Sequence, residues 1–268
     1  MLIDTHCHLD ASEFDHDRHA VIEKAFEHRV ARIVIPAVSR QNFQVVRDLA
    51  HSFDGGAYAL GIHPIGVPDA QEQDLRVLET MIVQALDDPR FVAIGEIGLD
   101  FFIPELKQEA MARRQEAFYV AQLELAQRYA LPVLLHVRRS QDQILKQLRR
   151  RPSVTGIAHA FNGSFQQAQH FVEQGFALGF GGAMTFARAL QIRRLATQLP
   201  LDALVLETDA PDIPPAWLGQ PGAPTPRNQP AEVSRIAHVL AELRGMTPEE
   251  VIVATGRNAQ RVLPRLMH

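Results

Sequence analysis

The amino-acid sequence predicts an α/β fold, a single closed (β/α)8 barrel in which each of eight parallel strands is followed by a helix. Short apolar runs alternate eight times with longer amphipathic stretches along 268 residues, which is the usual size of such a barrel. The apolar runs are continuous, as in parallel strands that are buried on both faces. No Gly-x-Gly-x-x-Gly pattern follows the first run, which weakens the alternative of an open dinucleotide-binding sheet.

The predicted strands are short and rich in Ile, Val, Leu and Ala. They cover residues 2–3, 32–36, 57–62, 91–95, 132–135, 156–158, 176–180 and 203–206. The helices predicted between them cover residues 18–30, 42–52, 74–86 and 107–129, with a last helix pair after Pro230. In the longest helix Phe118, Ala121 and Leu125 share one face, so this stripe is predicted to pack on the sheet.

One segment interrupts this alternation. Residues 211–230 follow the eighth predicted strand and contain seven prolines and two glycines. Because proline does not fit inside a helix, we expect a loop that lies over the mouth of the barrel. No domain boundary or internal repeat is evident, so residues 1–268 are expected to form one domain.

The composition limits where the protein acts and what it binds. The formal net charge of −4 argues against a broad basic surface for long nucleic acid, so any phosphate contact is expected to be local. Cys7 is the only cysteine, which excludes an internal disulfide and favours a reducing compartment. No apolar run reaches membrane-spanning length. We therefore expect a cytoplasmic protein with no membrane contact and no obligate protein partner.

Polar side chains gather where the predicted strands end. His6 and His8 follow the first strand with one residue between them, so both imidazoles point to the same face. Other strands are followed by His63, Glu96, His136, His159 and Asp209. The carboxyl ends of barrel strands meet at one edge, so these side chains should converge. A lone histidine there is more often a core residue, but buried unpaired carboxylates would each cost several kcal/mol, and divalent cations remove that cost.

The donors suffice for two metal ions. We expect His6, His8 and Asp209 to bind one ion, and His136 and His159 to bind the other, with Glu96 as the bridge. None of the three lysines ends a predicted strand, so a modified lysine is not the bridging group. Mixed imidazole and carboxylate ligands permit zinc, manganese or magnesium.

The chemistry of such a centre is hydrolysis. Two divalent ions lower the pKa of a shared water and stabilise an in-line displacement. Asp209 is the expected general base. Glu207, on the same face, is predicted either to position water or substrate or to orient a ligand. Arg138 or the adjacent Arg139 is predicted either to bind a phosphate or to be a solvated loop cation.

The ordered motifs resemble those of one family. They are Asp4-Thr-His-Cys-His8, Gly61-Ile-His-Pro64, Gly95-Glu-Ile-Gly-Leu-Asp100, Leu135-His136-Val-Arg138 and Leu206-Glu-Thr-Asp-Ala-Pro211. This set, between residue 1 and about residue 263, is similar to the TatD family of metal-dependent hydrolases, and most of all to its YjjV-type bacterial members. The resemblance implies a TIM barrel, and two or more divalent ions held by His6, His8, Glu96, His136, His159 and Asp209. It also implies that His63 lies at the substrate side and that the reaction is phosphodiester hydrolysis.

Three functional hypotheses follow. The leading one is a deoxyribonuclease or phosphodiesterase that uses a metal-activated water on DNA ends, with Asp209, Glu96 and His63 in catalysis and His63, Arg138 and Glu207 at the substrate. The second keeps the metals but cleaves an amide or ester in a small molecule or an acylated tRNA. The third is a binding protein with a degenerate metal site, against which the complete ligand set argues.

Overall fold

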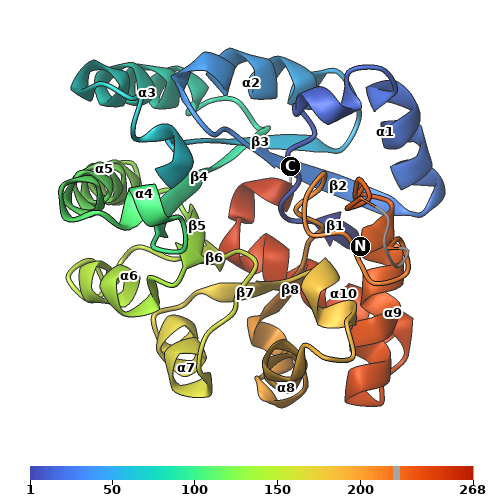
Figure 1. The fold of residues 1–268 in the computed structure, drawn as a ribbon. Helices are drawn as coiled ribbons and strands as arrows, with labels where there is room; N and C mark the ends of the chain where they lie inside the picture. Colours follow the sequence, from blue (N-terminus) through green and yellow to red (C-terminus); the bar gives the residue numbers. More distant parts are fainter. Residues whose placement is uncertain (220–223, 268) are drawn as a thin grey trace.

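The computed structural model describes residues 1–219 and 224–267, and its eight strands form one parallel sheet in sequence order. The strands are β1 (Leu2–Asp4), β2 (Val30–Pro36), β3 (Gly56–Leu60), β4 (Phe91–Asp100), β5 (Val133–Arg138), β6 (Gly156–Ala158), β7 (Ala177–Phe180) and β8 (Leu204–Leu206). The first and last strands meet where the amide of Thr5 donates to the carbonyl of Leu206, and a bridge joins Cys7 to Ala210. The predicted barrel fold is therefore confirmed (Figure 1).

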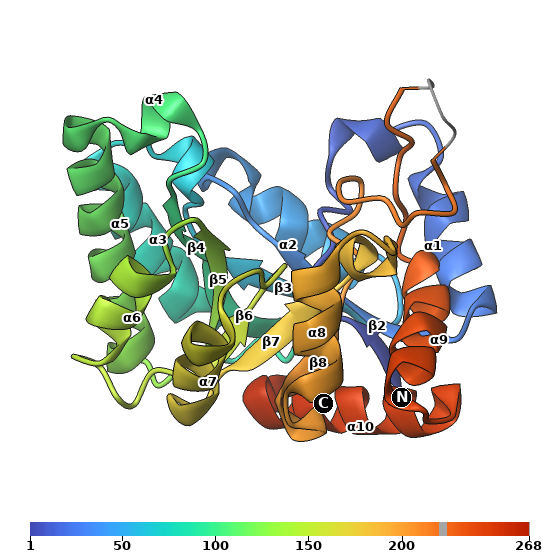
Figure 2. The ribbon, with the colours of Figure 1, turned by 60° about the horizontal axis from the view of Figure 1, so that its bottom comes forward.

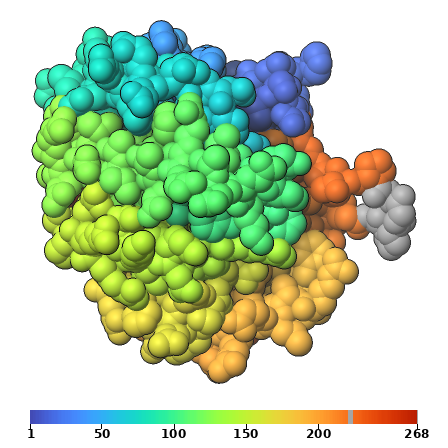
Figure 3. Space-filling model, turned by 60° about the vertical axis from the view of Figure 1, so that its left-hand side comes forward, coloured from blue at the N-terminus to red at the C-terminus, as the bar shows by residue number. Residues whose placement is uncertain are grey.

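Helices surround the strands. They are α1 (Arg18–Glu27), α2 (Phe43–His51), α3 (Glu72–Ala85), α4 (Pro104–Lys107), α5 (Glu109–Arg128), α6 (Gln141–Leu148), α7 (Phe165–Glu173), α8 (Leu190–Gln198), α9 (Glu232–Arg244) and α10 (Pro248–Val262). Short 3-10 turns occur at Ser12–Phe14, Arg40–Asn42, Pro64–Gly66, Gly182–Thr185, Leu201–Ala203 and Pro264–Met267. Figure 3 shows part of the outer layer, in which α3, α5 and α6 follow one another across the surface. No helix in the described part of the chain is long and apolar enough to cross a membrane.

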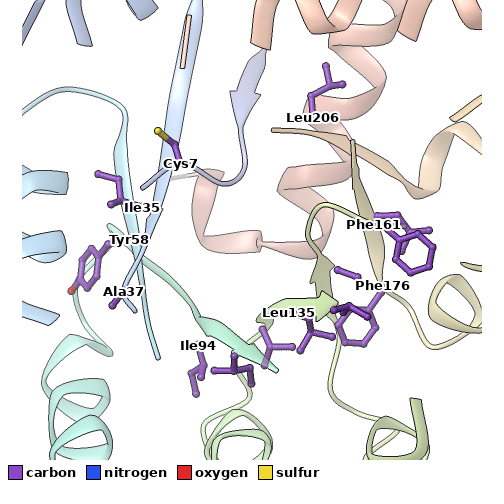
Figure 4. Close-up of a cluster of buried hydrophobic side chains, with 14 of the residues drawn as sticks. Cys7, Ile35, Ala37, Tyr58, Ile94, Leu135, Phe161, Phe176 and Leu206 are labelled. Carbon is purple, nitrogen blue, oxygen red and sulfur yellow. The ribbon is translucent and has the colours of Figure 1, made fainter. Parts of the chain in front are cut away.

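Two apolar layers hold the barrel together. The larger lies between the strands and the outer helices, and Figure 4 shows some of its side chains, among them Tyr58, Leu135 and Phe176. Phe118 and Leu125 of the predicted stripe are buried in this layer, while Ala121 is only partly buried. The smaller layer fills the barrel interior with aliphatic side chains from the strands, and α10 and the residues after it close it from below (Figure 2). The polar residues of the predicted metal site lie at the opposite end of the barrel, where the strands end.

The strand and helix boundaries differ from the prediction in two instructive places. The apolar pattern ends the fourth strand at residue 95, but β4 continues to Asp100 because Ile97 to Asp100 pair in register with Leu135 to Arg138 of β5. Glu96 therefore lies inside β4, and His136 inside β5, instead of following these strands. The helix predicted over residues 107–129 is divided at Gln108, whose ψ of 141° is extended.

The proline-rich segment lies at the carboxyl-terminal end of the barrel, beside the beginning of α1 (Figure 2). Its described residues, 211–219 and 224–230, form turns and irregular structure, as expected. Arg227 fixes it there by two hydrogen bonds to the carboxylate of Asp17, 2.6 and 2.7 Å long. Residues 220–223 of this predicted loop lie outside the described part.

Candidate metal centre

The carboxylate of Glu96 lies at the centre of the converging side chains. Its Oε2 atom is 3.0 Å from Nε2 of His6 and 3.4 Å from Nε2 of His8. Its Oε1 atom is 2.8 Å from Nδ1 of His136 and 3.4 Å from Nε2 of His159. One oxygen thus faces His6 and His8 and the other faces His136 and His159, as a bridging carboxylate would require. The rings of His6 and His159 are stacked with their centroids 3.7 Å apart, so His159 also lies within ligand distance of His6.

Asp209 completes the first half. Its Oδ1 atom is 3.7 Å from Nε2 of both His6 and His8, and 4.0 Å from Nε2 of His159. The backbone conformation at Asp209 is left-handed, with φ of 56°, and its amide donates to the carbonyl of His6. This hydrogen bond joins the turn after β8 to the end of β1, so closure of the barrel brings the carboxylate to the two imidazoles.

His63 belongs to the second half of the cluster. Its Nε2 atom is 3.3 Å from Oε1 of Glu96 and 3.0 Å from Nδ1 of His136. Its Nδ1 atom accepts a hydrogen bond from the amide of Ile65 in the turn that follows. The family resemblance implies a place at the substrate side for His63, and the structure puts its ring within ligand distance of the other donors.

The donor set fits divalent cations. Burial holds the pKa of His6 well below its usual range and lowers the pKa of His63 to about 4, so both rings are neutral, which is the form that binds metals. Burial disfavours charge on His8 as well, but Glu96 and Asp209 outweigh it and raise the pKa of His8 to about 9. The carboxylates therefore stabilise positive charge at this site, which either protons or divalent ions can supply.

Two further carboxylates lie behind the histidines of the donor set. Asp100, in β4, has its Oδ2 atom 3.0 Å from Nε2 of His136, and its Oδ1 atom accepts from the amides of Phe102 and Ile103. Burial alone would raise the pKa of Asp100, but these hydrogen bonds lower it to about 2. The sequence pattern did not single out Asp100 as a site residue, although Glu96 and Asp100 are four residues apart in one strand and hence on one face.

Glu207 is the second carboxylate that lies behind a histidine of the donor set. It is buried, its Oε1 atom is 3.4 Å from Nδ1 of His159, and it accepts a hydrogen bond from the amide of Ala160. Gly179 provides the space, because a Cβ atom there would come within 2.1 Å of the carboxylate. Of the two roles predicted for Glu207, this position favours the orientation of a ligand.

A cavity of about 720 Å³ opens above the centre. His136, His159 and Asp209 line it, whereas His6 and Glu96 are covered by their neighbours. Substrate in this cavity would therefore meet the outer edge of the donor set.

Comparison with known proteins identifies a family to which this chain is similar. The model of the family described as TatD related DNase matches residues 3–264. The uncharacterized metal-dependent hydrolase YjjV of Escherichia coli (strain K12) is 40% identical over 260 residues, which are 96% of this chain and 95% of the relative. Deoxyribonuclease TATDN3 of Homo sapiens is 33% identical over 273 residues, covering 100% and 96% of the two chains. The crystal structure of the Escherichia coli YjjV protein, a TatD homologue, superposes with a TM-score of 0.87 at 37% identity over 98% of both chains.

Proposed function

Because this chain belongs to the TatD-related DNase family of metal-dependent hydrolases, we propose that it hydrolyses phosphodiester bonds and acts as a deoxyribonuclease on accessible DNA ends. The observation that carries the proposal is the position of Glu96, with one carboxylate oxygen toward each group of imidazoles beneath an open cavity. Support for DNA as the substrate comes from the family and from the human relative that is named a deoxyribonuclease.

We assign the ligands as follows. His6, His8 and Asp209 would hold one divalent ion, and His136 and His159 the other, with Glu96 between them. His63 would complete the second group or contact the substrate. When bound, the ions would lower the pKa of a shared water and neutralise charge on the phosphodiester.

Asp209 is the proposed general base. Burial raises the pKa of this carboxyl to about 6, against the opposing effect of the neighbouring imidazoles of His159 and His8. This pKa belongs to the metal-free carboxyl; bound divalent ions would lower it and keep the carboxylate ionised, which is the form that accepts a proton. Its carboxylate is 14% exposed and lines the cavity, so it can reach the water that attacks the substrate.

The test is hydrolysis of end-labelled single-stranded DNA by metal-stripped protein to which manganese, magnesium or zinc is returned. Glu96→Gln should lower the restored activity by at least about 100-fold. Loss of a residue that only orients a metal ligand costs up to about 100-fold, and loss of the bridging ligand itself should cost more. Glu23→Gln, the same substitution at an exposed position on α1, is the matched control and should leave the activity unchanged.

Each result has one meaning. Restored trimming that disappears in Glu96→Gln supports the nuclease and its centre. Tight metal binding without trimming would remove DNA as the substrate and direct the search to esters, amides and acylated tRNA. Failure to bind any of the three metals would refute the centre itself.

A further inference from the structure

Phe102, just after β4, is exposed on one wall of the cavity. This residue is 46% exposed, and the guanidinium carbon of Arg138 lies 3.9 Å from the centroid of its ring. The guanidinium carbon of Arg139 lies 4.7 Å from the same centroid. All three side chains line the cavity that His136 and Asp209 enter from below. We call Phe102, Arg138 and Arg139 the arginine shelf.

Of these two arginines, only Arg138 forms an ion pair within the described residues. A guanidinium packed on an aromatic face keeps its N–H donors for another partner. The carboxylate nearest to Arg138 is that of Asp100, 3.7 Å away, and it already binds His136. Within residues 1–219 and 224–267, Arg139 has no carboxylate at ion-pair distance. The shelf therefore presents two cations with free donors to the cavity.

The lysine and arginine charge of the cavity is confined to this wall. Among the described residues that line the cavity, Arg138 and Arg139 are the only lysines or arginines, and Asp212 lies among the lining residues after β8. An anionic chain in the cavity would accordingly be drawn to the shelf. Arg139 adopts a left-handed backbone conformation with φ of 57°, which costs about 1 kcal/mol in a residue other than glycine. Such strain is typical of sites that position a side chain for binding.

The shelf lies beside the metal centre without belonging to it. Arg138 follows His136 by two residues in β5, so the two side chains project from the same face of the strand. The carboxylate of Asp100 separates the guanidinium of Arg138 from the imidazole of His136. A phosphate bound by the shelf would thus lie next to one at the metal centre.

We propose that the arginine shelf is a subsite for the phosphodiester adjacent to the one that is cleaved. The ligand class is a single-stranded oligonucleotide with at least two phosphodiesters, bound by guanidinium groups that Phe102 holds in place. This inference rests on the proposed function, because it names where the rest of the substrate strand lies.

The test measures binding by fluorescence anisotropy. The probe is a labelled single-stranded decanucleotide with phosphorothioate linkages, which keep the charge and slow hydrolysis, and the protein is metal-loaded. The variants are Arg138→Ala/Arg139→Ala and Phe102→Leu. The matched control is Arg149→Ala/Arg150→Ala, which removes two exposed arginines at the far end of α6.

The shelf variant should raise the dissociation constant about tenfold and reduce the slope of log K against log salt by about 0.7 for each phosphate that the arginines no longer bind. Phe102→Leu should raise the dissociation constant about two- to fivefold, because it removes only the ring. The control should change it by less than about twofold. A methylphosphonate at the linkage next to the cleaved one should weaken wild-type binding and have little further effect on the shelf variant.

The proposal is overturned if the shelf variant and the control bind the probe equally, or if the wild-type protein does not bind it. Binding that depends on the shelf without cleavage of an ordinary phosphodiester strand would support the shelf and contradict the proposed nuclease. Cleavage that is unaffected by the shelf variant, with equal binding, would support the nuclease and contradict the shelf.

Discussion

Replacing Gly179 by alanine tests whether the buried carboxylate of Glu207 orients His159. The backbone of Gly179 is not left-handed, so the new methyl group introduces no φ strain and acts through contact alone. Its Cβ atom would lie 2.1 Å from Oε2 and 2.5 Å from Cδ of Glu207. Atoms at these distances cannot coexist, so the carboxylate must move.

The loss of stability in Gly179→Ala depends on how easily the Glu207 side chain can be displaced. The side chain is 1% exposed and accepts the amide of Ala160, so moving it breaks a buried hydrogen bond and displaces packed neighbours. Overpacking of this kind costs about 1–3 kcal/mol of unfolding free energy. Loss of the group that orients a metal-binding histidine lowers metal affinity about 10- to 100-fold.

The assay combines urea unfolding with metal affinity measured by competition with a chelator. Gly219→Ala is the matched control, because the nearest atom of the described residues would be 3.8 Å from its Cβ. Glu207→Ala supplies the decisive comparison. If the clash is the cause, Gly179→Ala should cost nothing further once Glu207 is shortened, which appears as a strong coupling between the two substitutions.

The reasoning is refuted if Gly179→Ala is as stable as Gly219→Ala within about 0.5 kcal/mol and binds metal as tightly. Additive effects of Gly179→Ala and Glu207→Ala would also contradict it, since the carboxylate would then not be the group that the methyl meets.

Three further predictions concern the centre, the metals and the lower end of the barrel. Asp100→Asn should weaken metal binding about 10- to 100-fold, because His136 loses the carboxylate that orients it, as a chelator competition would detect. Removal of metal should lower the melting temperature by about 5–10 °C if the ions are present at about 100 times their dissociation constant, and equal melting with and without chelator would contradict a metal-filled centre. Asp88→Asn should lower stability by about 1–3 kcal/mol at pH 7, because the hydrogen bonds from His51 and Tyr58 are removed or weakened. Burial raises the pKa of Asp88, but its hydrogen bonds outweigh burial and lower this pKa below the ordinary value of 3.8. The difference in unfolding free energy between wild type and variant, measured in urea, should therefore persist above pH 3.8 and shrink as the pH falls below 3.8.

The order of strands and helices could be read from the sequence because each apolar run and each amphipathic stretch carries its own period. Boundaries were less predictable where polar residues continue a strand. β4 runs on through Glu96 to Asp100 because its ladder with β5 continues, and that pairing depends on residues about 40 positions away. The break at Gln108 is likewise not visible in the helical period of its neighbours.

The sequence by itself determined the barrel and the donor types at the ends of its strands, because strand periodicity sets which side chains share a face. Only the tertiary structure decided which donors from different strands meet. The separation of Glu96 oxygens between two groups of imidazoles, the place of His63 among the donors, and the pairing of Asp100 with His136 all arise from register between strands. The arginine shelf has the same origin, since Phe102 and Arg138 belong to different strand ends. The sequence pattern shows which side chains share a face of one strand, whereas the distances between side chains of different strands are set when the barrel closes.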